Sequence, residues 1–165
     1  MDTRSKLLIG AVGAVFSILG VALATPIVGL LSPLLAVGNR DADLHARGTA
    51  PTLNGEAFRV HLDTDGPSTV SIQDFSLAAG GHNGWHSHPG MVIVTLLSGS
   101  ITWYDEDCKA TNYDAGDSWV EGSQLHAFRV TSPKAIHAMA VFITAKGEAL
   151  RTDRPAPACG AELGL

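Results

Sequence analysis

In the stretch Gly84-Trp85-His86-Ser87-His88-Pro89-Gly90, two histidines are separated by a single residue. Residues i and i+2 of a β-strand point to the same face, so His86 and His88 can present both imidazoles to one point in space. A third histidine, His126, follows 38 residues after His88. A histidine on a neighbouring strand would complete a set of three nitrogen ligands that leaves positions on a metal open. His86, His88 and His126 are therefore candidate ligands, and whether their two faces meet depends on the tertiary fold.

On both sides of this stretch, short segments alternate apolar with polar residues and are separated by turn signals such as Ser98-Gly99 and Ala115-Gly116-Asp117. The predicted strands are 57–62, 69–77, 91–97, 100–104, 118–121, 125–130 and 136–143. This spacing favours an all-β sandwich or barrel over alternating strands and helices. In the segment 125–130, His126 shares a face with Phe128 and Val130, which predicts that this imidazole points inward.

The amino-terminal part of the chain contains a run of 32 residues, 7–38, without a charged side chain. About 20 apolar residues cross a bilayer, so the run is long enough for a membrane anchor. Ala22-Leu23-Ala24 matches a signal-peptide cleavage site, and a cleaved, secreted form is the alternative. Arg4 and Lys6 precede the run, which places the rest of the chain outside the cytoplasm. We therefore expect an export segment at 1–38, a linker at 39–54 and a β-domain at 55–165.

The cysteines and the charge balance restrict the compartment and the partners. Exported domains tend to pair their thiols, so we expect a disulfide between Cys108 and Cys159 that attaches the proline-rich tail to the domain. In the chain-entropy model a loop of this length contributes about 4 kcal/mol. The net charge is −5 at pH 7 and no basic block is present, which argues against nucleic acid as a partner.

The region from about residue 81 to residue 130 resembles the two sequence motifs of the cupin superfamily. The first motif has His-x-His, then a glutamate, and a glycine after six more residues. His86-Ser87-His88 and Gly99 match it, but the glutamate position falls on Val92. The second motif opens with glycine-aspartate and ends at a histidine. Gly116-Asp117 and His126 match it, whereas Glu121 and Ser123 stand near the positions of its proline and second glycine.

This resemblance implies a jelly-roll-like β-barrel that holds one divalent transition metal inside. It assigns ligand roles to His86, His88 and His126, and leaves the fourth position, Val92, without a ligand. Nitrogen ligands accept iron, manganese, zinc, nickel or copper, so the metal identity stays open. A homodimer is expected by analogy with the family.

Two functions follow from such a centre. The first is a metalloenzyme acting on a small molecule, as an oxygenase or as a lyase or isomerase. The second is a non-catalytic protein that binds metal or a small ligand at a vestigial site. A Tyr, Glu or Arg side chain facing the three histidines would favour catalysis, and a wholly apolar lining would favour binding.

The remaining polar and aromatic candidates are assigned structural roles. Glu121 is expected at a turn, exposed and outside the site. Asp105-Glu106-Asp107 is interpreted as a solvated hairpin turn and not as a calcium loop. The tryptophans and the other histidines are assigned to the core, to strands or to loops: Trp85, Trp103, Trp119, His45, His61, His82 and His137.

Overall fold

The computed structural model describes residues 27–52 and 55–165, and these residues are organised almost entirely as β-strands. The elements are β1 (Val28–Leu31), β2 (Leu34–Arg40), β3 (His45–Pro51), β4 (Ala57–Asp63), β5 (Ser68–His82), β6 (His86–Ser87), β7 (Met91–Ser98), β8 (Ser100–Asp105), β9 (Ala110–Asp114), β10 (Ser118–Glu121), β11 (His126–Val130), β12 (Ile136–Ala145), β13 (Thr152–Asp153) and the short helix α1 (Gly160–Leu163). The predicted all-β class is confirmed.

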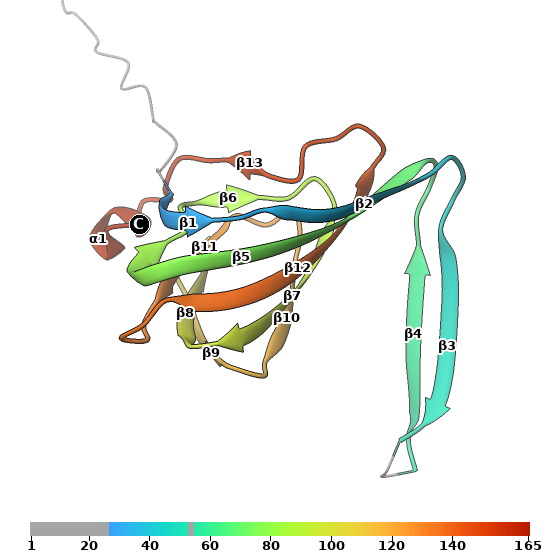
Figure 1. Ribbon diagram of the computed structural model, residues 1–165, viewed down its shortest axis with the longest axis horizontal. Coiled ribbons are helices and arrows are strands. Elements are labelled where there is room, and N and C mark those ends of the chain that lie inside the picture. Colours follow the sequence, from blue (N-terminus) through green and yellow to red (C-terminus); the bar gives the residue numbers. More distant parts are fainter. Residues whose placement is uncertain (1–26, 53–54) are drawn as a thin grey trace, which may run out of the picture.

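Most of these strands belong to one sheet that curls into a nearly closed barrel (Figure 1). Its main path runs β10-β7-β12-β5-β11-β6-β13, while β1 and β2 pair with β5, β8 pairs with β11, and β9 pairs with β8. The long antiparallel ladder of β5 with β12, from Ile136 opposite Leu77 to Ala145 opposite Ser68, forms one wall. The jelly-roll-like barrel expected from the sequence is therefore present.

The barrel core follows from the period-two pattern of the strands. In β12 buried and less buried residues alternate from Ile136 to Thr144, and β7 and β10 show the same alternation. The buried apolar side chains from the facing walls form one cluster, which includes Phe75, Leu77, Val92, Val94, Leu96, Ile101, Trp119, Phe128, Val130, Ile136 and Phe142. This cluster fixes the register of each strand, because a slip of one residue would turn its apolar side chains to solvent.

The domain boundaries differ from those expected. Strands β1 and β2 lie in the second half of the uncharged run and pair with β5, where Leu30 is opposite Leu77 and Ala36 is opposite Ile72. The barrel therefore includes residues 28–40, which the sequence analysis had divided between the export segment and the linker. The absence of charge did not distinguish an apolar strand at a sheet edge from a membrane segment. Residues 1–26, with most of the expected export segment, lie outside the described residues.

The expected linker also contains a strand. Seven residues of β3 pair with β4 in a separate two-stranded sheet that projects from the barrel (Figure 1). His45 on β3 is opposite Asp63 on β4, and the ring Nδ1 lies 2.9 Å from the carboxylate Oδ1. Strand 57–62 was predicted correctly, but it belongs to this projecting hairpin and not to the barrel.

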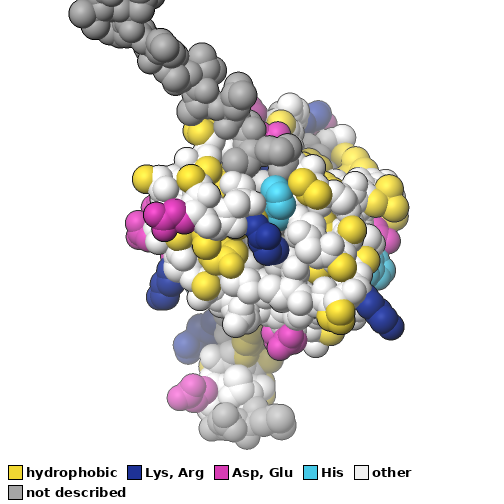
Figure 2. Space-filling view, turned by 90° about the vertical axis from the view of Figure 1, so that its left-hand side faces the viewer, with side chains coloured by type: hydrophobic (Ala, Val, Ile, Leu, Met, Phe, Trp, Pro, Cys, Tyr) yellow, Lys and Arg dark blue, Asp and Glu magenta, His cyan; other side chains and the backbone are white. Residues whose placement is uncertain are grey.

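Within the described residues, no helix has the length and apolar character needed to cross a bilayer. The face at the α1 end of the barrel carries acidic and basic side chains that are scattered among apolar and polar ones (Figure 2). No basic patch is visible on the coloured part of that face, in line with the net charge of −5.

Candidate metal centre

The three predicted histidines meet inside the barrel. His86 on β6 is directly opposite His126 on β11 in the antiparallel ladder, and His88 follows two residues after His86. The ring centroids lie 4.3 Å apart for His86 and His126, 4.8 Å for His86 and His88, and 5.2 Å for His88 and His126. All three side chains are buried. The structure therefore brings together the whole histidine set that the sequence pattern indicated.

Glu121, at the end of β10, is the fourth member of this cluster. Its carboxylate Oε2 lies 3.3 Å from His88 Nε2 and 3.4 Å from His126 Nε2. The expectation that Glu121 is exposed and outside the site is wrong, since only 7% of the residue is accessible. Strand periodicity was the missed signal, because Glu121 is two residues after Trp119 and shares its inward face.

Two tryptophans orient the Glu121 carboxylate. The indole Nε1 of Trp119 donates to Oε1 at 2.8 Å, and that of Trp103 donates to the same oxygen at 3.2 Å. The ring of Trp103 also stacks on His126 at a centroid distance of 5.6 Å. Because both indoles hold Oε1, Oε2 is the oxygen that faces the imidazoles. Trp103 and Trp119 therefore support the site in addition to packing in the barrel.

Each imidazole is oriented by a backbone carbonyl. The Nδ1 atoms lie 2.9 Å from Gly84 O for His86, 2.7 Å from Leu150 O for His88, and 2.8 Å from Gln124 O for His126. A carbonyl oxygen can only accept, so each Nδ1 carries the hydrogen. In the neutral ring the Nε2 lone pair is then free to bind a metal, the arrangement typical of metal-ligating histidines.

Protonation of the cluster is controlled by burial and by neighbouring charge. Burial lowers the pKa of His86 well below its ordinary value, and electrostatic interaction with His126 and Arg151 lowers it further. Burial by itself would raise the pKa of Glu121, but the close imidazoles of His126 and His88 outweigh that effect and hold this pKa well below its usual range. A neutral His86 and an ionised Glu121 are the forms that bind metal.

The ligand atoms fit a metal ion. One nitrogen from each histidine and one oxygen from Glu121 all lie within 4.8 Å of one another. Among the described residues, the Nε2 atoms of His88 and His126 are buried without a hydrogen-bond partner. A cation bound between these two nitrogens and the carboxylate Oε2 would give both Nε2 atoms a partner. Three imidazoles and one carboxylate suit a divalent transition metal.

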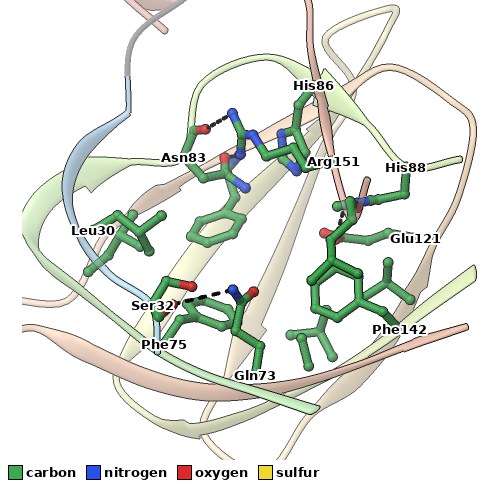
Figure 3. Close-up of a pocket in the computed structure, with 16 residues that line it drawn as sticks. Leu30, Ser32, Gln73, Phe75, Asn83, His86, His88, Glu121, Phe142 and Arg151 are labelled. Carbon is green, nitrogen blue, oxygen red and sulfur yellow. Dashed lines mark hydrogen bonds and ion pairs between the residues drawn. The ribbon is translucent and has the colours of Figure 1, made fainter. Parts of the chain in front are cut away.

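A cavity of about 140 Å³ lies beside the cluster. Its wall is mostly apolar, and its polar lining includes Asn83, Gln73, Ser32 and Arg151 together with the metal-binding candidates (Figure 3). Arg151 follows β12 in the chain and was not identified from the sequence, because a single arginine in a tail carries no motif. Its side chain is 21% accessible.

The expected turn at Asp105-Glu106-Asp107 is present between β8 and β9, with Glu106 and Asp107 exposed. It lines a second hollow, of about 380 Å³, whose wall also includes Glu121 and His126. The predicted disulfide between Cys108 and Cys159 is formed and attaches the carboxy-terminal tail to this turn.

The other histidines stay outside the cluster. His137 pairs with Asp74, at 2.5 Å between Nε2 and Oδ1, and His45 and His61 lie on the projecting hairpin. His82, at the end of β5, is partly exposed. All four lie outside the cluster, as expected, but His45 and His82 belong to strands β3 and β5 and not to a linker and a loop.

Comparisons with known proteins identify a domain family. Residues 73–142 match the family model described as a cupin domain. Among curated proteins, none matches this sequence.

The similar solved structures include a conserved protein of unknown function from Streptococcus pyogenes, with 22% identity, a TM-score of 0.46, and coverage of 72% of this chain and 76% of that one. A cupin-like protein from Thermotoga maritima has 17% identity, a TM-score of 0.47, and coverage of 53% and 65%. A polyketide cyclase from Streptomyces resistomycificus has 14% identity, a TM-score of 0.45, and coverage of 56% and 68%.

Proposed function

The chain belongs to the cupin superfamily, and from that premise we propose that it is a metalloenzyme that acts on a small molecule. The metal would be a divalent transition ion held by His86, His88, Glu121 and His126. The reaction class would be that of an oxygenase, or of a lyase or isomerase. The observation that carries this proposal is the convergence of imidazole Nε2 atoms and the Glu121 Oε2 atom, with each Nδ1 hydrogen directed to a backbone carbonyl.

Two polar side chains in the cavity favour catalysis over simple storage of metal. A Tyr, Glu or Arg side chain facing the histidines is the expected sign of catalysis, and both Glu121 and Arg151 line the cavity. A bound divalent ion would polarise a substrate oxygen at its open coordination positions. Arg151 supplies a fixed positive charge, and Glu121 supplies the anionic ligand among the described lining residues.

The apolar wall of the cavity keeps water away from a bound substrate. Phe75, Phe128 and Phe142 line the cavity together with Val92 and Val94. These side chains exclude bulk water from the substrate, and a low local dielectric strengthens the interaction of any substrate charge with the site.

Metal content tests this proposal first. Protein purified without added metal is analysed by inductively coupled plasma mass spectrometry, and we expect about one ion per chain. The double variant His86→Ala, His88→Ala should lose it. His137→Ala is the matched control, because His137 pairs with Asp74 outside the cluster. An unchanged metal content in the double variant would contradict the ligand assignment.

Turnover separates the enzyme from the non-catalytic alternative. Metal-loaded protein is incubated with a panel of small carboxylic acids, and substrate loss is followed by proton NMR, with an oxygen electrode to detect oxygenase activity. Activity that disappears in the double variant supports the enzyme. A loaded protein that binds these acids and leaves them unchanged would instead support the binding role.

We also propose that the protein is exported. The disulfide Cys108–Cys159 supports this, because such bonds persist in oxidising compartments. The uncharged residues that precede β1, 7–27, still match the length of a membrane-crossing segment, and Ala22-Leu23-Ala24 lies within them. Fractionation of cells and amino-terminal sequencing test the proposal. A mature protein that begins just after Ala24 indicates cleavage, an intact membrane-bound chain indicates an anchor, and a cytoplasmic chain would overturn export.

A further inference from the structure

Arg151 differs from the other arginines described, because it lines the cavity beside the candidate metal centre. Figure 3 shows its guanidinium beside His86 and Asn83. His86, Glu121 and Arg151 all line this cavity. An arginine placed here is available to a molecule that enters the cavity.

The Arg151 side chain is held in place from two directions. Its Nε donates to Asp153 Oδ1 at 2.5 Å, and its Nη2 donates to the backbone oxygen of Asn83 at 2.6 Å. A guanidinium has five N–H donors in a rigid planar fork. Among the described residues, Nη1 has no hydrogen-bond partner, so part of the fork stays free for a ligand. The two bonds reduce the entropy that the side chain would lose on binding.

The charge of the cavity favours an anion. Glu121 is the single carboxylate among its described lining residues, and it faces the imidazoles. A divalent ion, Glu121 and Arg151 together leave a net positive charge of about two. Asp153 offsets this only in part, because its side chain is 51% accessible and water screens it. A neutral or cationic molecule would leave this buried charge uncompensated.

The size and the wall of the cavity restrict the rest of the ligand. A volume of about 140 Å³ corresponds to roughly five water molecules at their share of liquid volume. Phe75, Phe142 and Val94 form apolar wall, while Gln73 offers a carboxamide away from Arg151 (Figure 3). The space fits a short apolar body attached to one charged group.

We propose that the cavity binds a small aliphatic carboxylate, whose anionic group is held by the Arg151 guanidinium next to the metal. The inference rests on the proposed function for the location of the metal, and it adds the substrate class. Arg151 acts as a binding residue in it. A planar carboxylate matches the planar guanidinium fork, and so an arginine recognises it better than a lysine does.

Calorimetric titration tests the proposal with butyrate as the probe and butyramide as its neutral isostere. Wild-type protein loaded with cobalt(II) should bind butyrate and discriminate against butyramide by at least about tenfold. In Arg151→Gln the butyrate affinity should fall about 10- to 100-fold, with the cobalt content unchanged. The butyrate affinity of Arg151→Lys should lie between those of wild type and Arg151→Gln, because lysine keeps the charge and lacks the planar guanidinium.

The matched control is Arg154→Gln, which removes an arginine from the same segment. Arg154 donates from Nε to Ser87 Oγ at 3.4 Å and does not line the cavity. Butyrate affinity should be preserved in this variant. An equal loss in both variants would mean that the tail, and not the Arg151 guanidinium, controls binding, and would overturn the proposal. Equal affinity for butyrate in wild type and Arg151→Gln would overturn it as well.

The visible spectrum of the cobalt(II) protein separates this inference from the proposed function. A wild-type protein that takes up no cobalt contradicts the metal centre, and butyrate titration of that metal-free protein still measures the effect of Arg151. A protein that takes up cobalt, but whose butyrate affinity is insensitive to Arg151→Gln, keeps the metal centre and contradicts the carboxylate proposal alone.

Discussion

Glu121 lies directly opposite Val92 in the antiparallel β7–β10 ladder. Val92 occupies the position where the resemblance to the family placed a glutamate, and the carboxylate is supplied by its cross-strand partner. Opposite residues in such a ladder have Cβ atoms about 4.5–5.5 Å apart. Either strand can therefore place a carboxylate next to the same imidazoles. The glutamate that is missing at Val92 on β7 is replaced by Glu121 on β10.

The exchange of these two residues is a direct test. Glu121→Val should weaken cobalt(II) or zinc(II) binding at least about tenfold, because a coordinating anion is lost. Adding Val92→Glu to that variant should restore part of the affinity, measured by competition with a chelator. Val92→Gln in the same background is the control of similar shape without charge. If the glutamate restores no more affinity than the glutamine, the cross-strand equivalence is refuted.

The hydrogen bonds from Trp119 and Trp103 to Glu121 should stabilise both the fold and the bound metal. Trp119→Phe removes the 2.8 Å hydrogen bond to Glu121 Oε1 and keeps an aromatic ring in the core. A hydrogen bond to an ionised group contributes about 1.5–3 kcal/mol, so both unfolding free energy and metal affinity should fall. Trp103→Phe removes a longer bond, of 3.2 Å, and should have a smaller effect on metal affinity. Urea denaturation and chelator competition measure the two quantities, and an unaffected Trp119→Phe variant would exclude the orienting role.

The unfolding free energy of the metal-free protein should depend on pH because His86 is buried in its neutral form. Unfolded His86 titrates near 6.5, and burial lowers its pKa in the folded state, so below pH 6.5 the unfolded chain binds the extra proton. The contribution of His86 to the unfolding free energy is thus fully present above pH 6.5. It decreases on acidification by up to about 1.4 kcal/mol per pH unit. Glu121 acts in the same direction below its ordinary pKa of 4.5, since its folded pKa is lowered.

Urea denaturation in the presence of a chelator, at several pH values from 7.5 to 4.5, measures this slope. His86→Gln should flatten the part between pH 6.5 and pH 5, because the proton uptake of the unfolded chain is removed. His45 acts in the opposite direction, because its hydrogen bond with Asp63 raises its pKa, but both side chains are exposed and water screens the pair. A wild-type stability that stays constant over the whole range would rule out a neutral buried His86.

The disulfide should stabilise both the fold and the cavity wall. Cys108–Cys159 attaches the tail whose earlier part, β13, pairs with β6 next to His86. Replacing both cysteines by serine should cost up to about 4 kcal/mol in unfolding free energy. Metal content should persist, while proteolysis of the tail accelerates and butyrate affinity falls, because Arg151 precedes β13. A variant with unchanged tail protection would show that the bond does not hold this segment.

Glycine at the end of the His-x-His-Pro-Gly stretch is required by packing. A Cβ at Gly90 would overlap the backbone carbonyl of Ile143 on β12. Gly90→Ala should therefore lower the unfolding free energy by about 1–3 kcal/mol or more and displace His88. Gly38→Ala is the control, since a Cβ added there would meet no atom within 4 Å outside its chain neighbours, and its backbone is not left-handed. Equal stabilities for the two variants would contradict the close approach.

The fold and the histidines were predictable because their signals are local. Period-two alternation revealed the strands that carry His86, His88 and His126, and the cysteine pairing was predicted from the expectation of export. The second half of the uncharged run was misassigned, since apolar composition is shared by membrane segments and by strands such as β1 and β2. Pairing with β5 is a long-range contact, and no single segment encodes it visibly.

Glu121 and Arg151 were missed for different reasons. The Glu121 side chain was judged by its position near a turn, although the alternation with Trp119 in β10 already indicated the inward face. Arg151 depends on the path of the tail, which is set by the disulfide and by the bond from His88 Nδ1 to Leu150 O. Only the three-dimensional course of the chain places it at the cavity.

The three imidazoles take their orientation from main-chain oxygens of Gly84, Gln124 and Leu150. A main-chain acceptor is present whatever side chain its residue carries, as long as the path of the backbone is kept. Substitutions can therefore change the carboxylate and the cavity lining of such a centre. The backbone of the barrel keeps the hydrogen of each imidazole on Nδ1.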